Sequence, residues 1–440
     1  MEEYRALADA VAADIQAGRL RPGERLPTQR RFARERGVAV STAARTYAEL
    51  GRRGLVTGEV GRGTFVKAAP APALAEVGAA TAVNLEVNFP LLPGQAELLA
   101  PALAGLLRPD ALEGGLVPPR AAGSPAARSA AADLLAREGW APDPANVLFA
   151  GNGRQAVAAA VSALVPVGGR LGVEALTYPV ARTIAARLGV ELVPLPMDAH
   201  GLLPDAVRAA ARLDAIYVQP TLHNPVTVTM PAERRAELAD VLAERGLPAV
   251  EDTIYAFLRD GPPPLAAFTP ERTVVVDSLS KRVAPGLTLG FVVPPAGLYD
   301  RLAAALRSGG WTAHAFALEA ATRWMADGVV QRVQEAKRAD AVQRQELVAH
   351  HLAEFTVHTD PVAYHCWWEL PAPWRADTFV AAAARRGIAV TPAAAFAVGA
   401  GEAVSAVRLA LAAPPLPTLA AGLDVLAALA RGAPGDDGTE

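Results

Sequence analysis

The chain has 440 residues, which predicts two or three domains, and its hydrophobic content of 52% is ample for a large core. The single cysteine, Cys366, excludes an intrachain disulfide, no apolar run reaches membrane-spanning length, and the first residues show no signal-peptide pattern, so we expect a cytoplasmic protein without membrane contact. The net charge of −3 divides unevenly: residues 1–67 hold thirteen Lys/Arg and eight Asp/Glu, which indicates that this part meets an anion.

The first 67 residues have the pattern of a winged helix-turn-helix. Apolar spacing and capping signals predict three helices, over residues 1–20, 29–36 and 42–53. Thr28 is the expected N-cap of the second helix, and Gly37 is its expected C-terminal stop. Two β-prone segments, 55–57 and 63–66, then surround a glycine-containing turn, which predicts a small β-hairpin as the wing.

Four motifs in this region resemble GntR-type DNA-binding domains: Leu20-Arg-Pro-Gly-Glu-Arg-Leu-Pro-Thr28, Thr46-Tyr-Ala-Glu-Leu50, Arg53-Gly-Leu-Val56 and Gly61-Arg-Gly-Thr-Phe-Val66. The resemblance implies double-stranded DNA as a partner, with the third helix in the major groove. The residues it places against DNA are Arg30, Ser41, Thr42, Arg45, Arg62, Gly63 and Thr64.

One position departs from the GntR pattern. Many relatives carry an arginine where this chain has Val40, so we expect direct base contacts to rest mainly on Arg45. A charged, solvated helix face is the alternative interpretation of this region, and the wing together with the basic charge argues against it.

A Pro/Ala-rich linker follows over residues 68–83, and helical and strand-like stretches alternate after it. This alternation predicts an α/β fold with a mainly parallel central sheet and helices on both faces. We expect the large domain over 84–332, a small C-terminal α+β subdomain over 333–430 and a disordered tail over 431–440.

Three predicted strands in the large domain end in polar side chains, which are Asn224, Asp252, Tyr255, Ser278, Ser280 and Lys281. Ligands bind at the carboxyl ends of the strands in an open parallel sheet. Lys281 is one of only three lysines in a chain that otherwise uses arginine, and a desolvated lysine amine can condense with a carbonyl. These residues therefore suit pyridoxal 5′-phosphate.

The ordered set resembles a fold-type-I, aspartate-aminotransferase-like domain. The resemblance implies that Lys281 holds the cofactor aldehyde as an internal aldimine and that Asp252 pairs with the pyridine nitrogen. Asn224 and Tyr255 would bond the phenolic oxygen of the ring. Taken singly, these residues could also be an Asn-Pro turn, a capping aspartate and a core tyrosine.

Further positions match the same family. Gly153, Arg154 and Gln155 open a helix after a strand and resemble the phosphate cup, assisted by Ser278 and Ser280. Tyr178 resembles the aromatic residue that stacks on the cofactor ring. Asn88 would lie near the substrate, and Arg408 would grip its α-carboxylate. A plain helix cap, a core tyrosine and a strand arginine in an ion pair are the respective alternatives.

Two departures concern the phosphate. Many relatives have a tyrosine where this chain has Val117, and most have an arginine where it has Thr288. Loss of a bidentate cation should weaken cofactor binding by about 1.5–3 kcal/mol, and the candidate replacements are Arg154 and Arg282. His223 could be a general base, but we favour an ordinary strand-end histidine because the lysine is the usual proton shuttle in this chemistry.

Together the two halves resemble MocR-type regulators over about residues 1–430. The resemblance implies a regulator that senses an amino acid or amine by external aldimine formation at Lys281, and that works as a head-to-tail homodimer on paired half-sites. A catalytically active aminotransferase that converts an amino acid to a 2-oxo acid is the alternative, so enzyme activity stays open. A regulator that has lost the cofactor is a third interpretation. No metal-ligand spacing is present.

Overall fold

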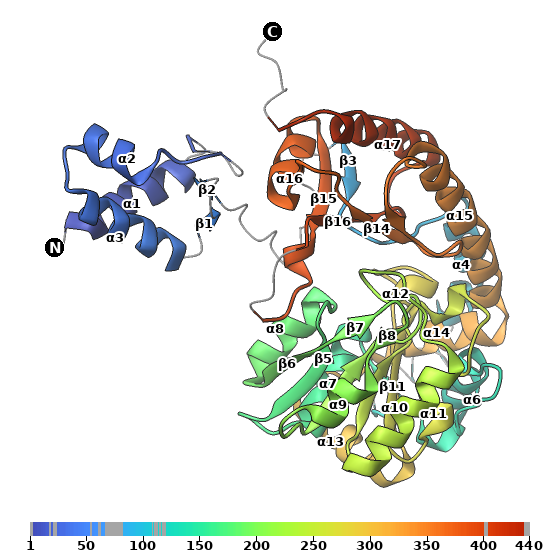
Figure 1. Ribbon diagram of the computed structural model, residues 1–440. Coiled ribbons are helices and arrows are strands. Elements are labelled where there is room, and N and C mark those ends of the chain that lie inside the picture. The colour runs from blue at the N-terminus through green and yellow to red at the C-terminus, as the bar shows by residue number, and fades with distance from the viewer. Residues whose placement is uncertain are drawn as a thin grey trace.

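The computed structural model describes residues 3–16, 19–20, 24–52, 55–59, 63–66, 82–107, 109, 113, 116, 120–399 and 404–434. Figure 1 shows a small N-terminal unit of helices beside a much larger α/β body. The predicted linker, apart from residues 82 and 83, lies outside the described residues, as do Arg62 and Val117. None of the helices in the described ranges has the length and apolar character that a membrane crossing requires.

The N-terminal unit is a winged helix, as the sequence predicts. Thr28 caps the second helix by accepting a hydrogen bond from the Arg31 N–H at 3.3 Å, and Gly37 ends it with a φ of 65°. Phe32 and Tyr47 pack edge to face in the core, with ring centroids 5.3 Å apart. The elements are α1 (Glu3–Gln16), α2 (Gln29–Arg36), α3 (Val40–Arg52), β1 (Val56–Glu59) and β2 (Gly63–Val66), with β1 and β2 antiparallel.

The large domain is built on a seven-stranded sheet in the order β4-β12-β11-β10-β9-β5-β6. Only β12 is antiparallel to its neighbours; the other described strands run parallel, so the predicted mainly parallel α/β fold is confirmed. The strands are β4 (Leu148–Ala150), β5 (Arg170–Glu174), β6 (Glu191–Leu195), β9 (Ala215–Val218), β10 (Ala249–Asp252), β11 (Thr273–Ser278) and β12 (Gly290–Val293). A short hairpin, β7 (Met197–Asp198) and β8 (Gly201–Leu202), stands apart.

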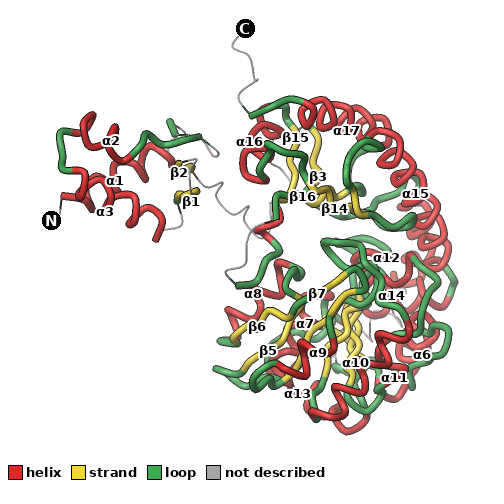
Figure 2. The backbone as a smooth tube through the Cα atoms, in the orientation of Figure 1, coloured by secondary structure: helices red, strands yellow, loops and turns green. Residues whose placement is uncertain are grey.

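Helices cover both faces of this sheet (Figure 2). Three apolar clusters fill the space between them and the strands, which explains why the central strands read as continuous apolar runs. The helices are α4 (Gln95–Ala104), α6 (Pro125–Leu135), α7 (Gly153–Leu164), α8 (Pro179–Leu188), α9 (Pro204–Ala209), α10 (Ala232–Arg245), α11 (Leu265–Phe268), α12 (Leu279–Arg282), α13 (Tyr299–Ser308) and α14 (Ala315–Ala326).

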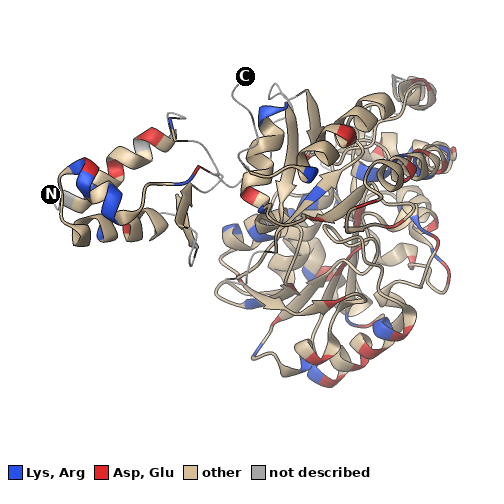
Figure 3. Cartoon of the chain, turned by 45° about the horizontal axis from the view of Figure 1, so that its top comes forward, with Lys and Arg blue, Asp and Glu red and all other residues tan. Residues whose placement is uncertain are grey.

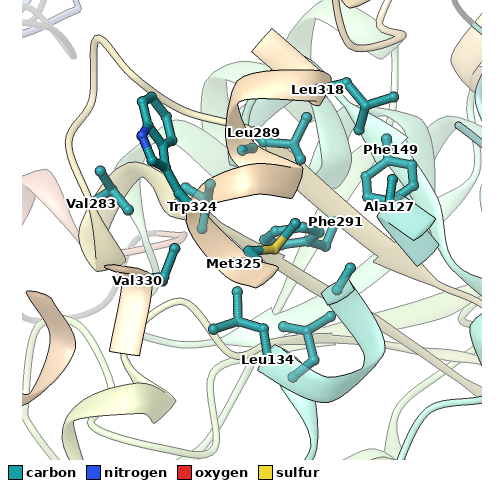
Figure 4. Packing of buried hydrophobic residues seen from close by; sticks show 14 of the residues in the cluster. Ala127, Leu134, Phe149, Val283, Leu289, Phe291, Leu318, Trp324, Met325 and Val330 are labelled. Atoms are coloured by element: carbon teal, nitrogen blue, oxygen red, sulfur yellow. The ribbon is translucent and has the colours of Figure 1, made fainter. Parts of the chain in front are cut away.

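One of these clusters supports the turn that carries the predicted lysine. Phe149 and Phe291 pack edge to face in it at 6.1 Å, and Trp324 and Val330 lie in the same cluster (Figure 4). Val283, which directly follows α12, is fully buried among these residues. The end of β11 and the short helix after it are therefore seated on a close-packed core, which fixes the backbone that bears the lysine.

The C-terminal part has a five-stranded sheet in the order β13-β14-β16-β15-β3. Its elements are α15 (Val329–His351), β13 (Val357–His358), β14 (His365–Glu369), α16 (Ala376–Arg385), β15 (Ile388–Pro392), β16 (Ala406–Ala410), α17 (Leu416–Arg431) and, from far upstream, β3 (Val83–Leu85). β3 pairs in parallel with β15, so the segment we assigned to the start of the large domain lies in the C-terminal sheet. The helix α15 runs unbroken through the boundary expected at residue 333.

The start of the expected tail is also ordered. Arg431 is the last residue of α17, and its guanidinium pairs with the Glu354 carboxylate at 2.6 Å. Residues 435–440, the greater part of that segment, lie outside the described residues.

Candidate functional site

A cavity of about 350 Å³ lies where the carboxyl ends of β9, β10 and β11 face the C-terminal sheet. Strand order explains its position, because β9, β10 and β11 are consecutive neighbours and their ends meet at one edge. Eleven of the predicted ligand residues line it: Asn88, Gly153, Arg154, Tyr178, Asn224, Asp252, Tyr255, Ser278, Ser280, Lys281 and Arg408.

Gln155 is the predicted cofactor residue that is not on the wall of this cavity. Its backbone N–H donates to the Asn152 side-chain oxygen at 3.0 Å, which caps α7. Its side-chain oxygen lies against the backbone of Gly151. In this arrangement the cavity is reached at the start of α7 by Asn152, Gly153 and Arg154 instead.

Lys281 lies in the single turn of α12, which begins as soon as β11 ends. Ser278 caps this turn by accepting a hydrogen bond from the Ser280 N–H at 3.2 Å. The Lys281 amine donates to the Asn88 carbonyl and lies 4.1 Å from the centre of the Phe89 ring. Burial, with the positive charges of nearby arginines, holds the pKa of Lys281 well below its usual range. A neutral amine is the nucleophilic form, so the site favours attack on a carbonyl.

Asp252 is the last residue of β10, and hydrogen-bond donors surround its carboxylate. Its carboxylate accepts hydrogen bonds from the Tyr217 hydroxyl at 2.6 Å and the Gln219 amide at 3.1 Å, and from the Ile254 N–H at 3.0 Å. Burial raises the pKa of Asp252 to about 6, against these donors, which lower it. A carboxylate in this setting suits a cationic N–H partner in the cavity, such as a protonated pyridine.

Arg408 projects from β16 of the C-terminal sheet and is buried. Its guanidinium donates to the Thr391 hydroxyl at 3.0 Å, to the Glu86 carbonyl, and at 3.5 Å to the Asn224 side chain. It forms no salt bridge with a described carboxylate, and burial lowers its pKa. Such a guanidinium can bind a ligand carboxylate by donating two parallel hydrogen bonds.

Three polar atoms of the wall residues have no hydrogen-bond partner within the described chain: Asn88 Oδ1, Gln219 Oε1 and Arg408 Nε. Buried polar groups are nearly always paired, so these atoms indicate a polar ligand. Asn88 also donates from its amide to the Tyr255 hydroxyl at 3.0 Å, which fixes that phenol at the cavity. The set of groups on the wall, with an amine, a carboxylate and several hydroxyls, fits pyridoxal 5′-phosphate.

Sequence reasoning missed Glu86, Phe89, Gln219 and Thr391, which also line the cavity. Gln219 immediately follows β9, so the strand-end rule that selected Asn224 could have found it. Glu86 directly follows β3 and Thr391 lies in β15, both in the other sheet, and no local pattern marks them.

His223 does not line the cavity. It is buried with its ring nitrogen 3.3 Å from the Glu174 carboxylate, as befits a strand-end histidine. Among the described residues, no group of three or more His, Cys, Asp or Glu could hold a metal ion.

The predicted DNA-binding side chains lie on α2, α3 and the wing. Arginines gather on α2 (Figure 3), where Arg30 is exposed. Ser41 and Arg45 are exposed on α3, and the Arg45 guanidinium lies 5.5 Å from the Tyr4 ring. Thr42 is half-buried. These positions give the unit an exposed basic face of the kind that meets phosphates.

The wing is held against the segment before α2. Gly63 opens β2 with a φ of 123°, and a Cβ there would lie 2.7 Å from the Arg25 side chain. The Thr64 carbonyl accepts from the Leu26 N–H at 2.8 Å. Glycine is favoured at this position by its positive φ, whereas the exposed Arg25 side chain could move away from an added Cβ.

Comparison with known proteins assigns both halves. Residues 3–66 match the model of the bacterial regulatory proteins of the gntR family, and residues 80–426 match that of aminotransferase class I and II. The HTH-type transcriptional regulator YdeF of Bacillus subtilis is 31% identical over 430 residues, covering 96% of this chain and 93% of the relative. The chain belongs to the MocR-type transcriptional regulators. A second relative of this MocR-type regulator is the pyridoxine biosynthesis regulator PdxR of Corynebacterium glutamicum, 26% identical over 74% of this chain and 73% of PdxR.

Solved structures share the fold of the MocR-type regulator's larger part. An archaeal alanine:glyoxylate aminotransferase superimposes with a TM-score of 0.73 at 21% identity, over 88% of this chain and 99% of the enzyme. The kynurenine aminotransferase of Pyrococcus horikoshii, solved in complex with PMP, gives 0.72 at 20% identity, over 80% of this chain and 91% of the enzyme. The predicted fold-type-I architecture is therefore confirmed, and the GntR domain implies DNA binding.

Proposed function

We propose that this MocR-type regulator binds pyridoxal 5′-phosphate at Lys281 and senses an amino acid or amine that displaces the lysine amine from the cofactor aldehyde. The observation that carries the proposal is the desolvated Lys281 amine on the wall of a cavity that Asp252 and Arg408 also line. When bound, the cofactor supplies an electrophilic carbonyl and an electron-withdrawing ring.

The side chains of this chain have separable tasks in that site. The Asp252 carboxylate holds a proton on the pyridine nitrogen, and its Tyr217 and Gln219 donors fix its orientation. The Tyr255 hydroxyl and the Asn224 amide bond the phenolic oxygen of the ring. Arg408 binds the carboxylate of the effector, with its orphaned Nε as an additional donor. The Tyr178 ring covers the cofactor face.

Ligand binding would be coupled to DNA binding through closure of the cavity. Lys281 belongs to the large domain, whereas Arg408 belongs to the C-terminal sheet. An effector that engages both at once binds more tightly to the closed arrangement than to an open one, and so shifts the population toward it. We propose a head-to-tail homodimer in which two winged helices contact paired half-sites of an operator.

One titration of the full-length protein tests this function. Candidate amino acids and amines are added while the visible absorbance of the cofactor and the affinity for the promoter-proximal DNA are recorded together. We expect one ligand to shift the absorbance and change DNA affinity without release of 2-oxo acid. Lys281→Ala should lose the lysine-dependent absorbance and the ligand response, whereas exposed Arg187→Ala on α8 should retain both.

Two outcomes would contradict the proposal. If the wild-type protein takes up no cofactor, or if Lys281→Ala shows the same cofactor absorbance as wild type, the lysine does not hold it. If 2-oxo acid accumulates over many turnovers while DNA affinity stays constant, the protein works as an aminotransferase. That alternative has one observation in its favour, because Lys281, Asp252 and Arg408 meet in a single cavity.

A further inference from the structure

The phosphate end of the proposed cofactor site has Thr288 at a position where the resemblance to aminotransferases implies an arginine in most relatives. In its place the Thr288 hydroxyl is hydrogen-bonded to the Ser280 hydroxyl at 2.7 Å. A phosphate monoester carries about 1.5–2 negative charges at neutral pH. Hydroxyl groups and backbone amides can bond its oxygens but carry no formal charge, so the site needs a cation from elsewhere.

Arg282, one of the two candidate replacements, is committed to other partners. Its guanidinium is buried in an ion pair with Asp277, with Nη2 2.7 Å from the carboxylate oxygen, and it also donates to the Gln334 side chain. It does not line the cavity. Withdrawing it toward a phosphate would leave Asp277 as an unpaired buried charge, which is costly.

The described cavity wall carries three basic side chains: Arg154, Lys281 and Arg408. Lys281 is reserved for the cofactor aldehyde. Arg408 is held at the C-terminal sheet by the Thr391 hydroxyl and the Glu86 carbonyl. Arg154 remains, and it pairs with no carboxylate of the described chain.

The position of Arg154 also fits this role. It is the second residue of α7, directly after Gly153, at which a Cβ would lie 2.9 Å from the Ser278 hydroxyl oxygen. The first turn of α7, with the positive end of its dipole, therefore lies next to the Ser278 hydroxyl, which is predicted to bind the phosphate. Arg154 lines the cavity together with Tyr178 and Lys281. Burial raises the pKa of Tyr178, and the nearby Arg154 guanidinium, which also hydrogen-bonds to the phenol, partly offsets that rise.

We propose that Arg154 supplies the positive charge for the cofactor phosphate, in place of the arginine that Thr288 replaces. The positive charge would then come from the first turn of α7 and not from the loop before β12. This assignment rests on the proposed binding of pyridoxal 5′-phosphate and concerns only its phosphate end.

The test compares two ligands that differ by the phosphate alone. Cofactor-free full-length protein is titrated with pyridoxal 5′-phosphate and with pyridoxal, and the dissociation constants are read from absorbance. Arg154→Ala should weaken pyridoxal phosphate binding by about tenfold to a hundredfold, the range for a lost charged hydrogen bond, and change pyridoxal binding by less than about threefold. Arg154→Gln separates charge from hydrogen bonding and should weaken it similarly. Arg187→Ala is the matched control and should change neither.

A second experiment introduces an arginine at position 288, where the resemblance implies one. In the background of Arg154→Ala, Thr288→Arg should recover most of the preference for pyridoxal phosphate over pyridoxal. The proposal is overturned if Arg154→Ala leaves that preference unchanged, including the case in which it weakens only effector binding, or if both ligands weaken equally. If wild type binds neither ligand, the proposed function itself fails, which is a separate result.

Discussion

The exposed arginines of the winged helix and the buried arginines of the aminotransferase-like body act in different ways. On α2 and α3, Arg30 and Arg45 stand exposed to solvent. In the body, Arg235, Arg282 and Arg408 are buried, and each is bonded to carbonyl oxygens, hydroxyls or carboxylates. Exposed charge acts over distance and is screened by salt, whereas buried charge acts through fixed geometry and shifts pKa values. Exposed arginines therefore suit binding to a polyanion, and buried arginines suit binding to one small ligand.

Breaking a buried pair should produce the largest effect. Arg282→Leu leaves the Asp277 carboxylate buried without its cation, and we expect the free energy of unfolding to fall by about 3–5 kcal/mol. Urea unfolding of the purified protein measures this. The control is Arg323→Leu, which removes a partly exposed pair with Glu319 at 3.1 Å and should cost no more than about 1 kcal/mol. Equal losses for the two variants would contradict the distinction.

Removing an exposed arginine should instead change DNA binding and leave stability intact. Arg45→Ala should weaken operator binding by about 1–3 kcal/mol, because the exposed guanidinium on α3 would contact the duplex. Affinity measured over a series of salt concentrations checks this, together with an unchanged unfolding curve. An unaltered affinity at every salt concentration would show that α3 does not face DNA.

Lys337 is a buried basic residue whose effect on stability should depend on pH. This fully buried lysine donates to the Lys281 carbonyl at 2.9 Å and to the Val283 carbonyl, so it braces the turn that bears the reactive amine. Burial lowers the pKa of Lys337 to about 7, partly offset by Asp340 on the same helix. The Tyr364 hydroxyl donates to the Lys337 backbone carbonyl at 2.7 Å and to the Asp340 carboxylate at 2.9 Å.

The sign of the pH effect follows from that depressed pKa. Above pH 7 the unfolded chain keeps a proton on Lys337 that the folded chain releases, so this group makes folding more favourable as pH rises. The stability of wild type relative to Lys337→Met should therefore increase by up to about 1.4 kcal/mol per pH unit above this value. Denaturant unfolding from about pH 6 to about pH 9 measures it. A difference that does not vary with pH would mean that Lys337 keeps one protonation state.

Local sequence patterns predicted the parts of the site that follow strands. Asn224, Asp252 and Lys281 were found because each stands just after an apolar run, and parallel strands bring such ends together. The winged helix was found for a similar reason, since Thr28 and Gly37 mark helix ends by their own chemistry.

The remainder depends on contacts between distant segments. Glu86 reaches the cavity only because β3 pairs with β15, some three hundred residues later in the chain, and that pairing is set by tertiary packing. The same pairing places β3 in the C-terminal sheet. The commitment of Arg282 to Asp277, rather than to the cavity, likewise depends on side-chain orientation that residue order does not determine.

The position of β3 links the segment that follows the winged helix in the sequence to the candidate site. β3 is the first element of the body among the described residues, and the carbonyl of the very next residue, Glu86, accepts a hydrogen bond from Arg408. An effector carboxylate bound by the Arg408 guanidinium, as we propose, would compete with this hydrogen bond to the Glu86 carbonyl. Under this proposal, one arginine would contact both the effector and the first described segment of the chain after the winged helix.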